Sequence, residues 1–111
     1  MMNKVLEYYE IIESGERNSR IAYKGLNFTE TLKAYENCSD FYAPKGTGNI
    51  YKVVVCADEN GELTRTRTLI VRSNSYGYEI EDDNYMHDFT IWAKNFHPNW
   101  PIHLVKEEEE N

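Results

Sequence analysis

The sequence is poor in cysteine and proline, and it contains no long apolar run. Its two cysteines, Cys38 and Cys56, are too few for the disulfide framework of a small secreted scaffold. No apolar stretch approaches the roughly 20 residues that a transmembrane helix needs, and the first residues lack the apolar segment of a signal peptide. These absences predict a cytoplasmic protein with reduced thiols and no membrane partner.

Basic residues are also scarce. Lys and Arg together number 12 against 19 Asp and Glu, which gives a net charge of −7. This charge opposes binding to nucleic acid through a general electrostatic field, and it suits a partner with a basic surface. The acidic residues gather in one internal stretch and in a tail at residues 107–111, which we expect to be solvated.

The residue spacings of known metal and catalytic sites are missing as well. The three histidines, His87, His97 and His103, do not have the close spacing of a zinc motif, and each cysteine is isolated in the sequence. Cys56 lies in an apolar run, which indicates a small core residue rather than a nucleophile. We therefore predict no metal, no cofactor and no enzymatic activity.

Aromatic residues, by contrast, are abundant. Nine Tyr, four Phe and two Trp are more than a core of this size easily hides. Some tyrosines are therefore expected at the surface, where they offer a large contact area at low entropic cost. The alternative is that most of them are half-buried on the face of a sheet.

The strongest structural signal is a β-hairpin. The segments Tyr51–Ala57 and Leu63–Arg72 are rich in β-branched residues, and they flank Asn60-Gly61, which favours a tight turn. On the second segment Arg65, Arg67 and Arg72 form either a basic stripe or the charged edge of an outer strand.

Other segments predict helices and short strands. The spacing of apolar residues indicates a helix over Asn3–Ser14, ended by Gly15, and a second helix over Asn27–Asn37 that begins with a capping box. Arg20–Lys24 and Ile102–Val105 are expected to be short strands.

The segment Tyr76–Phe96 fits two interpretations. It forms either a helix that begins at Asp83 and ends before His97-Pro98, or a second hairpin that turns at residues 82–84. We favour the helix. The fold class is then α+β, a small antiparallel sheet with two or three short helices packed on one face. One domain spans residues 1–106, followed by the acidic tail.

The opening of the chain resembles a known family. A short N-terminal helix, Gly15, a strand that bears Arg and Lys, and Tyr23-Lys24-Gly25-Leu26-Asn27 are similar to the start of the small phage anti-Thoeris sponges. The resemblance covers about 20 residues here and six at the end, from Trp100 to Val105. This chain has Leu26 where that family has Trp, and its middle does not correspond. The resemblance implies a phage or mobile-element origin, and in the family the activity is sequestration of a cyclic nucleotide signal.

An acidic cluster that includes Asp88 is interleaved with tyrosines, and this mixture suits docking onto a surface rich in Arg and Lys. A paired-carboxylate site, a cation site and a solvated face are the alternatives. Our leading hypothesis is a non-enzymatic phage-type inhibitor of the anti-defence kind, which binds a basic groove of a host protein, such as a groove for nucleic acid. The residues expected to bind this partner are Tyr76, Tyr78, Glu79, Glu81, Asp82 and Asp83.

The second hypothesis is a small-molecule sponge or sensor that binds a nucleotide. The loop Pro44–Asn49 has the composition of a phosphate-binding loop, but it precedes a strand, whereas such loops follow a strand and open a helix. We expect a plain loop there. In this alternative the phosphate ligands would be Arg20, Lys24 and Lys45.

Overall fold

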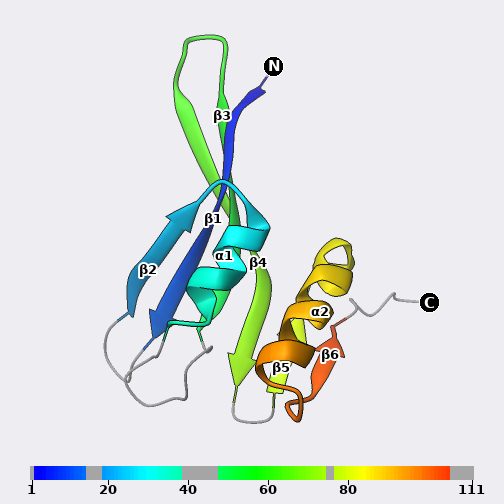
Figure 1. Ribbon diagram of the computed structural model, residues 1–111. Helices are drawn as coiled ribbons and strands as arrows, with labels where there is room; N and C mark the ends of the chain where they lie inside the picture. Colours follow the sequence, from blue (N-terminus) through cyan, green and yellow to red (C-terminus); the bar gives the residue numbers. More distant parts are fainter. Residues whose placement is uncertain (1, 15–18, 39–47, 75–76, 106–111) are drawn as a thin grey trace, which may run out of the picture.

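The computed structural model describes residues 2–14, 19–38, 48–74 and 77–105. Figure 1 shows the arrangement of its strands and helices. In chain order these elements are β1 (Asn3–Ser14), β2 (Ser19–Gly25), α1 (Phe28–Tyr35), β3 (Asn49–Ala57), β4 (Leu63–Asn74), β5 (Gly77–Ile80), the 3₁₀ helix η1 (Asp83–Tyr85), α2 (Met86–Phe96) and β6 (Ile102–Leu104).

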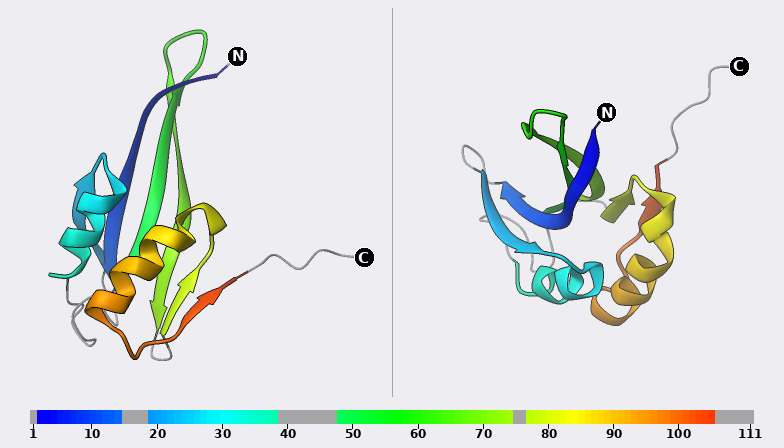
Figure 2. Two further views of the ribbon diagram at one scale, coloured as in Figure 1. Left: turned by 45° about the vertical axis from the view of Figure 1, so that its right-hand side comes forward. Right: turned by 90° about the horizontal axis from the view of Figure 1, so that it is seen from above.

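The six strands form one open sheet in the order β2-β1-β3-β4-β5-β6. All neighbouring strands are antiparallel except β5 and β6, which run parallel because α2 connects them. Figure 2 shows both helices on the same side of the sheet. The predicted α+β class, with helices packed on one face of a largely antiparallel sheet, is confirmed.

The N-terminal segment is a strand, and the predicted helix over Asn3–Ser14 is wrong. β1 lies inside the sheet, paired with β2 on one side and with β3 on the other. The glutamates that fit the polar face of a helix are mostly buried: Glu10 and Glu13 are 0% and 1% exposed. Its β-branched and aromatic residues favour a strand once partners are available on both sides. Gly15 lies outside the described residues.

The β3–β4 hairpin is confirmed. Its turn is closed by Asp58, whose carboxylate accepts the backbone N–H groups of Asn60 and Glu62 at 2.8 and 2.9 Å. Gly61 has a φ of 81°, a conformation that favours glycine.

A bulge in β4 sets which side chains face the helices. Tyr51 lies opposite Leu69 and Ile50 lies opposite Val71, so Ile70 is an extra residue. Ile70 and Val71 are both fully buried. Because the bulge shifts the alternation by one residue, Arg72 lies on the same face of β4 as Arg65 and Arg67, away from the helices.

The helix predictions for the rest of the chain hold. Asn27 caps α1 by accepting the N–H of Glu30 at 3.0 Å. The helical interpretation of the region after Asp83 is confirmed by η1 and α2, and the two short strands are confirmed by β2 and β6. Among the described residues, no helix is long and apolar enough to cross a membrane.

Most buried aromatic residues lie between the sheet and the two helices. Tyr78 of β5 packs edge-on against Phe89 of α2, with ring centroids 5.0 Å apart, and Tyr35 of α1 lies 5.3 Å from Trp92. The expectation of exposed tyrosines is not met among the described residues, where Tyr8, Tyr9, Tyr35 and Tyr78 are buried and Tyr23, Tyr51 and Tyr85 are half-buried.

A smaller buried cluster lies on the opposite face of the sheet. It consists of Tyr8, Val53 and Val55, which are at most 7% exposed. Tyr8 lies opposite Val53 in the β1–β3 register, whereas its neighbour Tyr9 belongs to the core under the helices. We call this side of the sheet the helix-free face.

Candidate functional site

The acidic cluster is only partly one surface. Glu81, Asp83 and Asp88 are exposed in the segment that leads into and begins α2, and Asp82 between them is half-buried. Glu79 is separate, because β5 turns its neighbours Tyr78 and Ile80 into the core. Its side chain therefore lies on the helix-free face, in register with Arg72 of β4 and His103 of β6.

Tyr78 does not belong to the predicted docking surface, because it is fully buried. Its hydroxyl lies 2.6 Å from His97 Nδ1, and its ring packs edge-on against Trp100 at 4.8 Å. Burial raises the pKa of Tyr78 far above its ordinary value. This prediction is wrong: the residue stabilises the core. Tyr76, the other predicted tyrosine, lies outside the described residues.

Two of the acids have local structural roles. Asp82 caps η1, since its carboxylate accepts the N–H of Asn84 at 3.0 Å. Asp83 and Asp88 occupy the first turns of η1 and α2, where the positive end of the helix dipole favours a carboxylate. These interactions explain why acids are favourable at the start of the helices, but they leave Asp83 and Asp88 exposed to solvent.

A groove between α1 and α2 adjoins this acidic segment. We call it the helix groove; its volume is about 290 Å³. Asp88, Ile91 and Trp92 of α2 share one side of their helix, being spaced at i, i+3 and i+4. The residues that line the helix groove are Thr29, Leu32, Lys33, Glu36, Asp88, Ile91 and Trp92.

The helix groove is apolar at its base and charged at its margins. The indole Nε1 of Trp92 donates to Glu36 Oε2 at 3.0 Å, which joins the two helices. Ile91 is 52% exposed although it is a large apolar side chain. Asp88 belongs both to the acidic segment and to the groove, so carboxylates and an apolar recess are continuous here.

Sequence reasoning missed the apolar half of this surface. The aromatic stripe of Tyr85, Phe89, Trp92 and Phe96 marks the buried side of α2. Ile91 lies outside that stripe, and an isoleucine on the solvent side of an amphipathic helix is the signal that points to it. Leu32 and Glu36 of α1 have no such signal, because only the packing of α1 beside α2 brings them to the groove.

The basic residues proposed as phosphate ligands are not brought together. Arg20 Nη2 lies 2.8 Å from Glu13 Oε1 in an ion pair between β2 and β1. Lys24 lies further along β2, with its Nζ 3.8 Å from Glu10 Oε2. Lys45 lies outside the described residues.

The described part of the chain holds no group of three His, Cys, Asp or Glu side chains placed to bind a metal ion. Cys38 is buried, and burial raises the pKa of its thiol to about 11, so it stays protonated near neutral pH. The chemistry that the surface at α1 and α2 offers is charge from exposed carboxylates and apolar contact in the helix groove.

Comparisons with protein-family models, curated proteins and solved structures found no match for this chain.

Proposed function

We propose that this protein is a non-enzymatic binding protein whose acidic surface at α2 binds a basic protein. The observation that carries the proposal is the continuity between exposed carboxylates at Glu81, Asp83 and Asp88 and the apolar helix groove. An interface needs apolar area for affinity and charges for orientation and rate of encounter. This surface offers both.

The chemistry of the surface indicates the partner. Carboxylates recognise Arg and Lys side chains through charge-assisted hydrogen bonds, and the apolar recess accepts a side chain lying between two basic residues. The net charge of −7 adds long-range attraction to any basic surface. The partner we propose is a host protein with a basic groove, of the kind that handles nucleic acid.

The biological role we propose is inhibition by a phage or mobile element in the cytoplasm of a bacterial host. Small size and acidity support it. The resemblance of the chain's opening to phage anti-defence proteins now rests on Tyr23–Asn27 and the C-terminal segment, because the N-terminal helix that it implied is the strand β1.

The first experiment captures the partner. The immobilised protein is exposed to bacterial lysate, washed and eluted with a rising salt gradient, and each fraction is identified by mass spectrometry. The proposal predicts a basic, nucleic-acid-handling protein that elutes as the salt rises, because salt screens exposed charges. Retention of no protein, or of one whose binding is indifferent to salt, contradicts the proposal.

A variant of the groove tests the apolar contribution. Ile91→Ser removes an exposed apolar side chain without opening the core, and it should weaken partner binding about tenfold, as expected for a central apolar contact. Leu63→Ser is the matched control, since Leu63 is 67% exposed on the distant hairpin. Equal affinities of the two variants for the captured partner would remove the groove from the interface.

A further inference from the structure

The helix-free face contains a second site, distinct from the acidic surface. It is a pocket of about 400 Å³, which we call the sheet pocket. This volume lies in the range of small-molecule sites. The pocket is lined by Leu6, Tyr8, Lys24, Gly25, Leu26 and Arg65.

Curvature of the sheet creates the pocket. Lys24 is on β2 and Arg65 is on β4, three strand positions apart in the order β2-β1-β3-β4. On a flat sheet these strands would be roughly 14 Å apart, so one pocket can include both residues only where the sheet curls toward this side. The same curling explains why Tyr8 is 7% exposed on a face that carries no helix.

The charges around the pocket are mainly positive. Glu10 is fully buried beside it, and its Oε1 lies 2.8 Å from Arg67 Nη2, which neutralises that arginine. Lys24 Nζ lies 3.8 Å from the other oxygen of Glu10, and this oxygen accepts no hydrogen bond from the described residues. Within the described chain Arg65 makes no ion pair, so its charge is available to a ligand. The Lys24 ammonium shares Glu10 with Arg67 and lies 5.9 Å from the centre of the Tyr8 ring.

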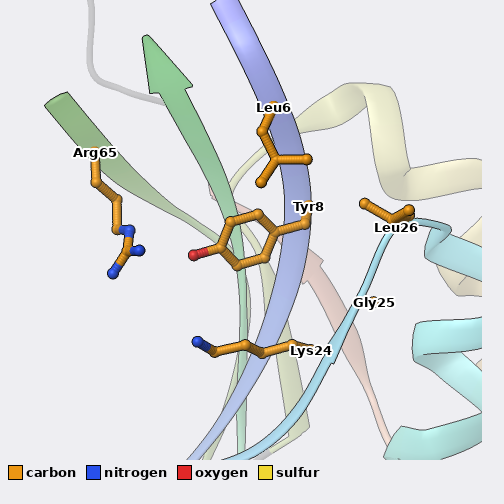
Figure 3. Close-up of a pocket in the computed structure, with 6 residues that line it drawn as sticks. All are labelled: Leu6, Tyr8, Lys24, Gly25, Leu26 and Arg65. Carbon is orange, nitrogen blue, oxygen red and sulfur yellow. The ribbon is translucent and has the colours of Figure 1, made fainter. Parts of the chain in front are cut away.

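The other half of the pocket is apolar. Leu6 and Leu26 are 44% and 73% exposed, a costly arrangement for leucines that nothing in the described chain covers. Figure 3 shows the Lys24 side chain and the hydroxyl of Tyr8 pointing toward the side of the pocket where Arg65 of β4 lies. Leu26 lies at the opposite end of the pocket. The pocket is therefore polar and cationic at one end and apolar at the other.

We infer that the sheet pocket binds a small organic anion with an apolar body. A phosphate or carboxylate head group would bind Arg65 and Lys24, because both cations can donate charge-assisted hydrogen bonds to it. The apolar body would cover Leu6 and Leu26 and lie against the ring of Tyr8. An anion would bind at this pocket in preference to other parts of the surface, because the protein as a whole is acidic and repels anions.

Titrations of the ¹⁵N-labelled protein test this site. The probes are 1-naphthyl phosphate and octanoate, which distinguish an aromatic phosphate from an aliphatic carboxylate as the natural ligand chemistry. Octylamine, with the opposite charge, and inorganic phosphate, without an apolar body, are the controls. We expect amide shifts at residues of the sheet pocket with at least one of the two anions, and affinities at least tenfold weaker for both controls.

Variants assign the contacts. Arg65→Ala and Lys24→Ala should each lower the affinity for the bound probe about tenfold, as loss of a hydrogen bond from a charged group does. Arg72→Ala, on the same face of β4 but outside the pocket, should leave the affinity unchanged. Leu26→Asp, at a position exposed enough to preserve the fold, should abolish binding.

The inference is overturned if neither anion shifts the pocket amides at millimolar concentration, or if octylamine binds as well as octanoate. Equal affinity of Arg65→Ala and Arg72→Ala would also overturn it. None of these results bears on the acidic surface at α2, which binds its partner on the other side of the sheet.

Discussion

Glu10 is buried on a face of the sheet that no helix covers. The negative charge of its carboxylate is compensated mainly by an arginine that reaches solvent. The carboxylate is 0% exposed, whereas the Arg67 side chain that pairs with it is 40% exposed. A buried charge without a partner loses its hydration energy, and no ion pair offsets that loss. An exposed guanidinium without a partner is hydrated by water instead. Removing Arg67 should therefore lower the free energy of unfolding more than removing the charge of Glu10.

This inequality can be measured in a double-mutant cycle of urea unfolding. Arg67→Met should lower the free energy of unfolding by roughly 2–3 kcal/mol, because it leaves the buried carboxylate with only the more distant Lys24 ammonium, 3.8 Å away. Glu10→Gln should cost about 1 kcal/mol. Adding Arg67→Met to the Glu10→Gln background should then cost little more. Equal and additive losses would show that the carboxylate is hydrated.

Alkaline pH should destabilise the protein through its buried thiol and phenols. Burial raises the pKa of Cys38 to about 11, and it raises the pKa values of Tyr9 and Tyr78 well above their ordinary 10. The unfolded chain ionises a cysteine near pH 8.5, so the folded state holds more protons above that pH. Stability is then complete below about pH 8.5 and falls as the pH rises through 11.

Urea midpoints at pH 8, 9.5 and 10.5 measure this loss of stability. In Cys38→Ala the decline between pH 8 and 9.5 should become shallower, because the tyrosines ionise later even in the unfolded chain. A midpoint that stays constant or increases with pH would show that these groups titrate alike in both states.

At the scale of elements, the hairpin, α1 and α2 could be predicted because their signals are local. A turn glycine, a capping asparagine and an apolar stripe act within a few residues of the element they specify. β1 could not be predicted in this way. Its apolar residues lie on both faces of the sheet. Glu10 is buried against Arg67, 57 residues away, and Glu13 against Arg20, seven residues away.

The same limit applied to the sites. The exposure of Asp83 and Asp88 could be expected from the acidic stretch, but the position of Tyr78 could not, because its burial depends on β6 and α2. Arg65 and Leu26 are 39 residues apart, and only the curvature of the sheet places them in one pocket. No spacing in the sequence records that proximity.

The parallel β5–β6 pair depends on Gly77. Gly77 has a φ of 143°, and a Cβ there would collide with the carbonyl oxygen of Pro101, which accepts the Tyr78 N–H at 2.9 Å. Gly77→Ala should therefore destabilise the protein by about 2 kcal/mol more than Gly61→Ala. Gly61 is the matched control, since it also has a positive φ but open space around it. Thermal unfolding compares the two variants. Equal losses of stability would mean that the chain at Pro101 can move away from the added Cβ at no energetic cost.

At the scale of the whole molecule, the two candidate surfaces differ in charge and lie on opposite sides of the sheet. Exposed carboxylates lie at the start of α2 on the helical side, and Lys24 and Arg65 lie at the sheet pocket on the helix-free face. A molecule with a net charge of −7 thus has a locally basic pocket and an acidic surface on opposite sides. The two proposals can therefore be tested with separate variants.

Charge reversal at the acidic surface is the measurement that tests the central claim most directly. Asp83→Lys/Asp88→Lys reverses two exposed acids there, and Glu59→Lys/Glu62→Lys makes the same change in net charge on the distant hairpin loop. The affinity of each variant for the captured partner is measured at low and at physiological salt, with folding checked by circular dichroism. We predict that the first variant loses binding at both salt concentrations and that the second retains most of it. Equal weakening by the two folded variants would mean that net charge alone attracts the partner, and the acidic surface at α2 would then not be its binding site.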